Sequence, residues 1–487
     1  MPAFEAVIGL EVHAELLTQS KMFCACRVVD PLVAGPNAAV CEVCTGMPGT
    51  LPVVNARAVE FALRTALALN CTISQTSVFA RKNYFYPDLP KGYQISQYDL
   101  PLAHDGWLKI ETAAGEKRVS IRRVHLEEDT GKLFHRGDHS LVDYNRSGVP
   151  LLEVVTEPEL FSLDEVKAYA TSLRSLLRYL DVTTGDMEKG AIRFEANVSI
   201  RPAGSQALGT RTEIKNLNSF RAMLRALAFE IERHGHILEQ GGHVVQETLR
   251  WSDARGETYP ERGKEEAEDY RYFPEPDLPP LVVEPAWIEQ IAASLPELPA
   301  ARRSRLSSQY GLSSYTARTL TADRAVADFF EASLAAAPDL PPEKIAHWVS
   351  GELFGLLNQE GLELQECKVT PQGVAELALL VEGGQLNLSS AKAVLAEMFV
   401  SGGSPSAIAE GHSLAQLNDP AEIARLVEAA LSSHPAQVEQ YLAGKTAIAQ
   451  WLFGQVMRSA RGRANPALVQ KLLQDGLRAM EENRRAL

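Results

Sequence analysis

The segment that decides the fold reads HLEEDTGK at residues 125–132 and continues as DYNRSGVPLLE at residues 143–153. The three adjacent carboxylates at residues 127–129 repel one another unless water or a cation compensates their charge. In the second part, Asn145 and Arg146 are polar groups able to hold an anion, and they lead into an apolar run. The segment therefore places charged chemistry at the mouth of a buried strand.

Length and composition are typical of a soluble protein with several domains. A chain of 487 residues exceeds what one hydrophobic core normally organises, so two or three domains are expected. Its contents of 45% hydrophobic and 23% charged residues are ordinary for a globular protein. No run of eighteen apolar residues occurs, and the N-terminus lacks a basic region and an apolar signal core. We therefore predict a cytoplasmic protein with no membrane partner.

Charge is unevenly distributed along the chain. The net charge of −14 argues against a general binder of polyanions. Residues 435–487 hold eight Lys or Arg and four Asp or Glu, a balance of +4, so the remainder carries −18. A basic end on an acidic body favours a local nucleic-acid contact, whereas a solvated helical surface would account for it without any partner. Charge alone leaves both interpretations open.

Four of the six cysteines form two close pairs separated by fourteen residues. This spacing suits a tetrahedral thiolate site, and zinc is the commonest metal for four sulfurs in a reducing cytosol. Disulfides are the weaker alternative, because nothing marks the chain as secreted. A closed site of this kind would staple a loop, while Cys71 and Cys367 are predicted to be buried apolar fillers. The predicted zinc ligands are Cys24, Cys26, Cys41 and Cys44.

The first 280 residues mix strand and helix patterns. Residues 4–15 and 192–201 alternate between apolar and polar positions, as half-buried strands do, and residues 211–215 form a third polar row. Apolar residues at helical spacing predict helices over residues 163–180 and 218–233. We expect an α+β fold, in which one sheet face packs on helices and the other carries polar groups.

Proline and glycine mark the domain boundaries. Four prolines close the mixed region at residues 274–280, and the chain beyond them is rich in Ala and Leu at helical spacing. The sequence SGGSP at residues 401–405 reads as a second linker. We therefore predict a mixed-sheet domain at residues 1–290, a helical domain at 291–403 and a helical tail at 404–487.

The polar faces of the predicted strands could line one acidic cleft together with Glu127 and Glu128. Oxygen-rich clusters of this kind hold Mg²⁺, whose preferred partners include nucleotide phosphates. A histidine is an unusual magnesium ligand and would also suit a softer metal. The alternative is that each row is the solvated side of a half-exposed sheet. The residues in these rows are Glu11, His13, Glu15, Glu195, Asn197, Arg211, Glu213 and Lys215.

A second candidate segment, RKNYFYPDLPKGY at residues 81–93, combines cations with aromatic rings. It could stack an adenine or another base and neutralise phosphate, although a proline-stiffened surface loop has the same composition. Phosphate-binding loops are missing, since Gly444-Lys445-Thr446 matches only the end of a P-loop. If ATP binds, the acidic cleft must therefore hold it through a metal.

Taken together, these segments resemble the B-subunit family of tRNA-dependent amidotransferases (GatB). The resemblance covers essentially the whole chain, and so many long matches in order are highly specific. The end of the chain resembles the YqeY-like tail of that family. The matching segments are IGLEVH at 8–13, the four-cysteine loop, RKNYFYPDLP at 81–90, HLEED at 125–129, DYNRSGVPL at 143–151, KNLNSF at 215–220, YRYFPEPD at 270–277, GQVM at 454–457 and RGRANP at 461–466.

The resemblance implies a catalytic cradle, a helical domain and a tail that touches tRNA. It also implies ATP-dependent phosphorylation of the misacylated side chain of Glu-tRNA(Gln) or Asp-tRNA(Asn), followed by amidation with ammonia. The ammonia would come from a glutaminase A subunit in a complex that includes a small C subunit. Because this chain shows no serine and lysine arrangement for releasing ammonia from glutamine, we predict no glutaminase activity in isolation.

The resemblance also assigns roles to residues of this chain. The implied cofactors are ATP, Mg²⁺ and a structural Zn²⁺. The implied magnesium ligands are Glu11, His13, Glu128 and Glu195. The implied catalytic groups are Glu128, Glu127, Lys82, Tyr84 and Arg146, and the implied ATP-binding groups are Arg81, Lys82, Asn145 and Arg146. The implied tRNA contacts are Arg458, Arg461, Arg463 and Lys471.

Two other functions fit parts of the same sequence. A ligase that amidates a free amino acid would not need the basic tail, so deleting residues 406–487 should leave it active. A zinc-stapled tRNA-binding scaffold would have no turnover to lose in Glu128→Gln. The sequence does not show which misacylated tRNA is the substrate.

Overall fold

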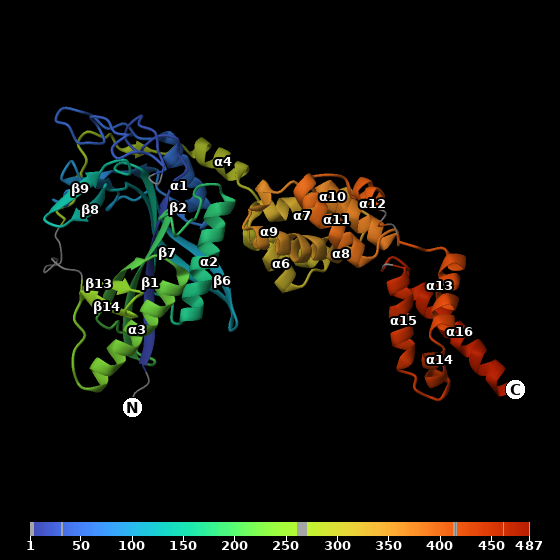
Figure 1. The fold of residues 1–487 in the computed structure, drawn as a ribbon. Coiled ribbons are helices and arrows are strands. Elements are labelled where there is room, and N and C mark those ends of the chain that lie inside the picture. The colour runs from blue at the N-terminus through green and yellow to red at the C-terminus, as the bar shows by residue number, and fades with distance from the viewer. Residues whose placement is uncertain are drawn as a thin grey trace. The chain divides into compact units, whose positions relative to one another are not determined.

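The computed structural model describes residues 4–30, 33–260, 270–412, 414, 416–460 and 462–486 (Figure 1). The chain divides into two compact units, Met1–Pro299 and Ala300–Leu487. The first holds a large mixed sheet with helices, and the described part of the second is helical. The predicted α+β class is therefore confirmed. The predicted boundaries after residues 290 and 403 stay predictions.

A nine-stranded sheet organises the first unit, with β1 at its centre. Neighbouring strands are antiparallel throughout, except for the parallel pair β12 and β13. The strand order is β14 (Glu257–Pro260), β13 (Glu247–Ser252), β12 (Thr212–Leu217), β11 (Ile192–Pro202), β1 (Phe4–Glu15), β10 (Pro150–Thr156), β7 (Gly115–Glu128), β6 (Ala103–Thr112) and β2 (Thr72–Ile73).

Three helices cover one face of this sheet: α1 (Ala56–Ala68), α2 (Leu163–Tyr179) and α3 (Phe220–Glu239) (Figure 1). Alternate residues of β1, such as Ile8 and Leu10, are buried in the core beneath them. The polar residues of β1 must then lie on the opposite face, because successive strand residues point to opposite sides. The predicted strand at residues 4–15 and helix at 163–180 are confirmed within one residue.

Smaller sheets lie beside the end of β7. A three-stranded sheet joins β4 (Ala80–Asn83) to β5 (Tyr93–Ser96) and β15 (Phe273–Pro274). Segments almost two hundred residues apart therefore meet next to the carboxylates that end β7. The other small sheets pair β3 (Thr76–Ser77) with β16 (Leu281–Val282), and β8 (Lys132–Arg136) with β9 (His139–Asp143).

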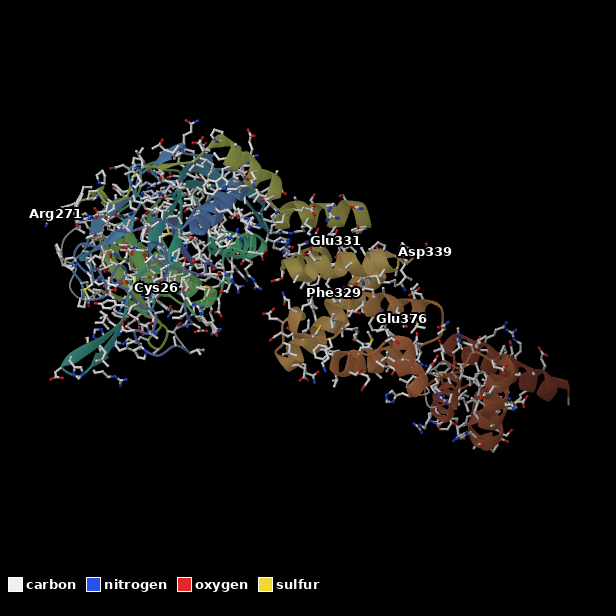
Figure 2. All side chains as sticks on the ribbon, turned by 90° about the horizontal axis from the view of Figure 1, so that it is seen from above. Cys26, Arg271, Phe329, Glu331, Asp339 and Glu376 are labelled. Carbon is white, nitrogen blue, oxygen red and sulfur yellow. The ribbon has the colours of Figure 1, made fainter. Side chains whose placement is uncertain are left out.

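The second unit contains two hydrophobic clusters, one formed between Leu306 and Ala409 and the other between Ile423 and Leu477. Figure 2 labels Phe329 and Glu331 on α7, and Glu331 pairs with Arg302 and Arg305 of α5. No helix in the described ranges is long and apolar enough to span a bilayer. The main helices after the sheet are α4 (Pro285–Ser294), α5 (Pro299–Tyr310), α6 (Ser314–Leu320), α7 (Arg324–Ala336), α8 (Pro342–His347), α9 (Phe354–Glu360), α10 (Pro371–Glu382), α11 (Leu388–Ser401), α12 (Pro405–Gly411), α13 (Pro420–Ser433), α14 (Pro435–Leu442), α15 (Ile448–Ser459) and α16 (Pro466–Ala486).

Candidate functional site

The register of the central strands builds a row of polar side chains across the uncovered face of the sheet. His13 of β1 lies opposite Glu153 of β10, which lies opposite His125 of β7. Directly paired residues share a sheet face, so these three side chains converge. His13 Nε2 is 3.5 Å from an oxygen of Glu153 and 3.5 Å from Glu127 Oε1. His125 Nε2 is 3.0 Å from Glu153 Oε2.

His13, Glu127 and Glu153 form a cluster able to hold a metal ion, with one ligand atom from each within 4.8 Å of the others. Two carboxylates and an imidazole suit a divalent cation. Glu11 and Glu195 flank this cluster on paired positions of β1 and β11. Three of the four predicted magnesium ligands therefore lie together, and Glu153 adds a group that the sequence reasoning did not assign.

The electrostatics of the cluster follow from burial and opposite charges. Burial disfavours the charged form of Glu153, but His125 and His13 hold its pKa well below the usual range. Burial likewise disfavours the charge on His13, but mainly through Glu153 its pKa rises to about 9. Burial opposes the charge on Lys82, while Glu127 and nearby tyrosines raise its pKa. Glu127 thus has a cation close by.

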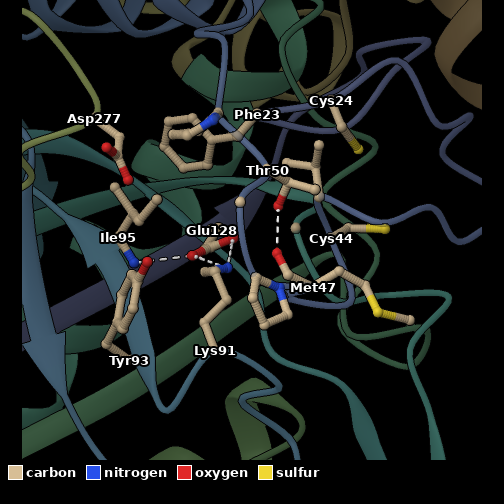
Figure 3. A pocket seen from close by; sticks show the side chains of 16 residues that line it. Phe23, Cys24, Cys44, Met47, Thr50, Lys91, Tyr93, Ile95, Glu128 and Asp277 are labelled. Carbon is tan, nitrogen blue, oxygen red and sulfur yellow. Dashed lines mark hydrogen bonds and ion pairs between the residues drawn. The ribbon is translucent and has the colours of Figure 1, made fainter.

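The structure contradicts the grouping of Glu128 with His13. Glu127 and Glu128 are successive strand residues, so their side chains leave β7 in opposite directions. Glu128 lines a pocket of about 200 Å³ (Figure 3). There Lys91 Nζ and the Ile95 amide donate to its carboxylate at 2.8 and 2.9 Å. Glu128 therefore belongs to this pocket rather than to the metal cluster.

The predicted anion-binding pair, Asn145 and Arg146, has internal partners. Asn145 accepts a hydrogen bond from the Ala39 amide at 2.9 Å and donates one to the Gly35 carbonyl at 2.8 Å. Asn145 therefore tethers the cysteine loop, and these contacts argue against the predicted role in binding ATP. Arg146 Nε lies 3.4 Å from Asp129 Oδ2, which places its guanidinium beside the carboxylate segment.

The segment at residues 81–93 forms part of the wall of the site. Arg81 binds both oxygens of buried Glu275 at 2.7 Å and lies over the Tyr93 ring, so it clamps two chain segments together. Its predicted role in binding ATP would require breaking this clamp. Lys82 Nζ lies 4.8 Å from the centre of the Tyr270 ring. Tyr84 stacks against a neighbouring tyrosine, with ring centres 5.7 Å apart.

The four cysteines of the predicted zinc site come together. The Sγ of Cys44 lies 4.0 Å from those of Cys26 and Cys41. Four thiolates bound to zinc at about 2.3 Å would be about 3.8 Å apart, so this donor set fits the metal. A hydrogen bond with Cys24 is the largest factor that lowers the pKa of Cys44, to about 4.

Basic residues of the tail occupy the helices at the end of the chain. Arg458 is exposed on α15, Lys471 is exposed on α16, and Arg463 is half-buried between these helices. Arg461 lies outside the described residues. The predicted tRNA contacts in the described range therefore lie on or next to α15 and α16, two of the helices that build the last hydrophobic cluster.

The sequence of this chain also matches known protein families. The profile of the GatB/GatE catalytic domain matches residues 6–289, and that of the GatB domain matches residues 328–477. The chain belongs to the GatB family. Three relatives are each named as the B subunit of an aspartyl/glutamyl-tRNA(Asn/Gln) amidotransferase. They come from Moorella thermoacetica (51% identity, 97% of this chain, 100% of the relative), Caldanaerobacter subterraneus (50%, 97%, 99%) and Persephonella marina (47%, 98%, 100%).

Glu153 was not assigned to the site in the sequence analysis, although the sequence around it contains an indication of its role. Glu153 stands inside the apolar run of β10, and a carboxylate in a fully buried strand requires a partner or a metal. Its partners, His13 and His125, could be identified only once the strand register was known.

Proposed function

We propose that this chain is the transamidating subunit of a tRNA-dependent amidotransferase, an enzyme of the ligase class. The proposed substrate is misacylated Glu-tRNA(Gln), misacylated Asp-tRNA(Asn) or both. The observation that carries the proposal is the carboxylate and imidazole cluster of His13, Glu127 and Glu153 on one face of the sheet, in a chain of the GatB family.

The proposed reaction has two steps that together replace a carboxylate oxygen with nitrogen. First, an oxygen of the Glu or Asp side chain attacks the γ-phosphorus of ATP, which forms an acyl phosphate and releases ADP. Ammonia then attacks the acyl carbon, and the bond between that carbon and the phosphate oxygen breaks. Inorganic phosphate leaves with the electron pair of this bond, and the nitrogen loses a proton to give the amide. The first step is needed because a carboxylate oxygen is a poor leaving group.

His13, Glu127 and Glu153 would hold Mg²⁺, with Glu11 and Glu195 contributing negative charge around it. The metal supplies charge neutralisation for the phosphates of ATP. Lys82 lies close to Glu127 of this cluster, and Arg146 lies beside Asp129, two residues further along the chain. We propose that Lys82 and Arg146 orient the phosphates or the acyl group, with Tyr84 in the adjoining wall. Glu127 and Glu128 stay proposed catalytic groups.

We further propose that Cys24, Cys26, Cys41 and Cys44 hold a structural Zn²⁺, which would fix the cysteine loop. The proposed partners are a glutaminase A subunit that supplies ammonia and a small C subunit. Arg458, Arg463 and Lys471, together with Arg461, would contact the tRNA. The proposed location is the cytoplasm, where misacylated tRNA is made.

The test is a transamidation assay on the purified complex, prepared by co-expression with the partner subunits. Each misacylated tRNA is supplied in turn with glutamine, and ATP is omitted in a parallel reaction. We expect ATP-dependent conversion of at least one aminoacyl-tRNA to its amide. Conversion without ATP, or none on either tRNA with ATP present, would overturn the proposal.

A further inference from the structure

Lys21 has an unusual environment for a lysine. Its side chain is 0% exposed, which places it among the largest fully buried side chains of the protein. Burying an isolated ammonium is costly, so such a group requires a compensating negative charge. Among the residues that the structure describes, no carboxylate forms an ion pair with Lys21. The compensating charge must come from another group.

The cysteine loop places a sulfur atom beside the ammonium. The Nζ of Lys21 lies 3.5 Å from the Sγ of Cys44 in a buried contact. A thiolate at Cys44 would compensate the ammonium, as a metal-bound cysteine requires. The backbone of Lys21 also belongs to this loop, because its amide donates to the carbonyl of Cys26 at 2.9 Å.

The same ammonium also binds the segment that carries Arg146. Lys21 Nζ donates to the carbonyl of Tyr144 at 3.1 Å. The next residue of the chain reinforces this link, because the Met22 amide donates to the Gly148 carbonyl at 2.7 Å. The hydroxyl of Ser147 donates to the Cys44 carbonyl at 3.2 Å. Loop and segment are therefore joined on both sides of Arg146.

We propose that Lys21 is a positioning residue that compensates the charge of the thiolate site and couples that site to the segment carrying Arg146. Loss of its ammonium would weaken zinc retention and let Arg146 move away from Asp129. The effect on turnover rests on the proposed function of the chain, whereas the effect on zinc retention does not.

The first test compares Lys21→Met with Asn55→Ala in the full chain. Asn55 donates to the carbonyls of Ser20 and Lys21 at 3.0 and 3.2 Å, so its loss loosens the same segment but keeps the ammonium. The rate of zinc release to a coloured chelator is the main readout. We expect release about tenfold faster in Lys21→Met and within about twofold of wild type in Asn55→Ala.

Turnover gives a second readout in the complex with its partner subunits. We expect kcat for transamidation to fall about tenfold in Lys21→Met, with KM for the tRNA unchanged. Wild-type zinc release from Lys21→Met, equal acceleration in Asn55→Ala, or a wild-type chain that holds no metal at the four cysteines would each overturn the inference. Absence of turnover in the wild type would instead refute the proposed function, and zinc release would still decide the role of Lys21.

A third measurement needs no variant and applies even if Lys21→Met does not fold. Zinc is removed from the wild-type chain with a chelator, and hydrogen exchange is followed by mass spectrometry. We expect faster exchange at residues 143–149 as well as in the cysteine loop, while the distant helix α3 stays unchanged. Faster exchange in the cysteine loop alone would contradict the coupling.

Discussion

The four-cysteine group and the carboxylate cluster are both arranged so that they could hold a metal ion, but their side chains come from very different distances along the chain. The four cysteines lie within residues 24–44 of one loop. The cluster takes His13 from β1, Glu127 from β7 and Glu153 from β10. Residue spacing specifies the first site. The carboxylate cluster forms because the strand register brings distant residues onto one face of the sheet. Which residues belong to it therefore cannot be found without the fold.

The largest effect is expected from changing Glu153, the member of the cluster that the sequence analysis did not assign. Glu153→Gln keeps the size of the side chain but removes the carboxylate charge that contacts His13 and His125. We expect kcat for transamidation to fall about a thousandfold, with tRNA affinity retained, because the loss concerns charge at the reacting phosphate. The matched control is Glu157→Gln, just beyond the end of β10. It should keep wild-type turnover because the ion pair that Glu157 makes among the described residues is a partly exposed one with Arg122. Normal turnover in Glu153→Gln would refute the cluster as the reaction site.

The thiolate site should respond in stability and metal content. In Cys44→Ser we expect less than half an equivalent of zinc and a free energy of unfolding lowered by about 4 kcal/mol, because the loop loses its staple. Elemental analysis and urea denaturation measure the two quantities. Cys71→Ser is the control, since Cys71 lies outside the loop and should keep full zinc. Full zinc content in Cys44→Ser would show that the four sulfurs do not act together.

Arg81 provides a further test, because the sequence predicts that it binds ATP whereas the structure shows it bound to Glu275. Its partner Glu275 has a fully buried side chain, so Arg81→Ala leaves that carboxylate without its cation. We expect the free energy of unfolding to fall by about 3 kcal/mol. Arg57→Ala, which breaks an exposed pair with Glu60, should cost about 0.5 kcal/mol or less. Unchanged stability with a much higher KM for ATP would instead support the predicted contact with nucleotide.

The smallest effects are expected in the tail. Lys471→Ala and Arg458→Ala should each weaken tRNA binding a few-fold and reduce the salt dependence of binding by about one charge, because each would remove one proposed phosphate contact. Filter binding over a range of salt concentrations measures both. Lys392→Ala, which breaks a pair with Glu352 in the helical domain, is the control. An unchanged salt slope in both tail variants would favour the interpretation of a solvated surface.

Much of the fold could be predicted because its signals are local. The alternation in β1 identified Glu11 and His13 as sharing a face, and the helical spacing located α2. The choice between Glu127 and Glu128 could not be made, because adjacent strand residues point to opposite faces and only the register with β10 assigns each to a side. A resemblance of motifs does not supply that register.

The roles of Asn145 and Arg81 could not be predicted for a second reason. Both residues look suited to bind an anion when seen in isolation. The partners that engage them, at residues 35–39 and at Glu275, are distant in sequence and are found only in the folded chain. Side-chain chemistry shows what a residue is able to bind, but tertiary contacts decide whether it is available.

The most direct test of the carboxylate cluster is Mn²⁺ binding to the full-length chain, followed by electron paramagnetic resonance as loss of the free-ion signal. Mn²⁺ takes the same oxygen and imidazole ligands as Mg²⁺. The cluster predicts that Glu153→Gln loses tight Mn²⁺ binding, while Glu128→Gln binds within about threefold of wild type. Retained Mn²⁺ binding in Glu153→Gln together with loss of binding in Glu128→Gln would contradict the proposed cluster. That result would place the metal in the pocket that contains Glu128.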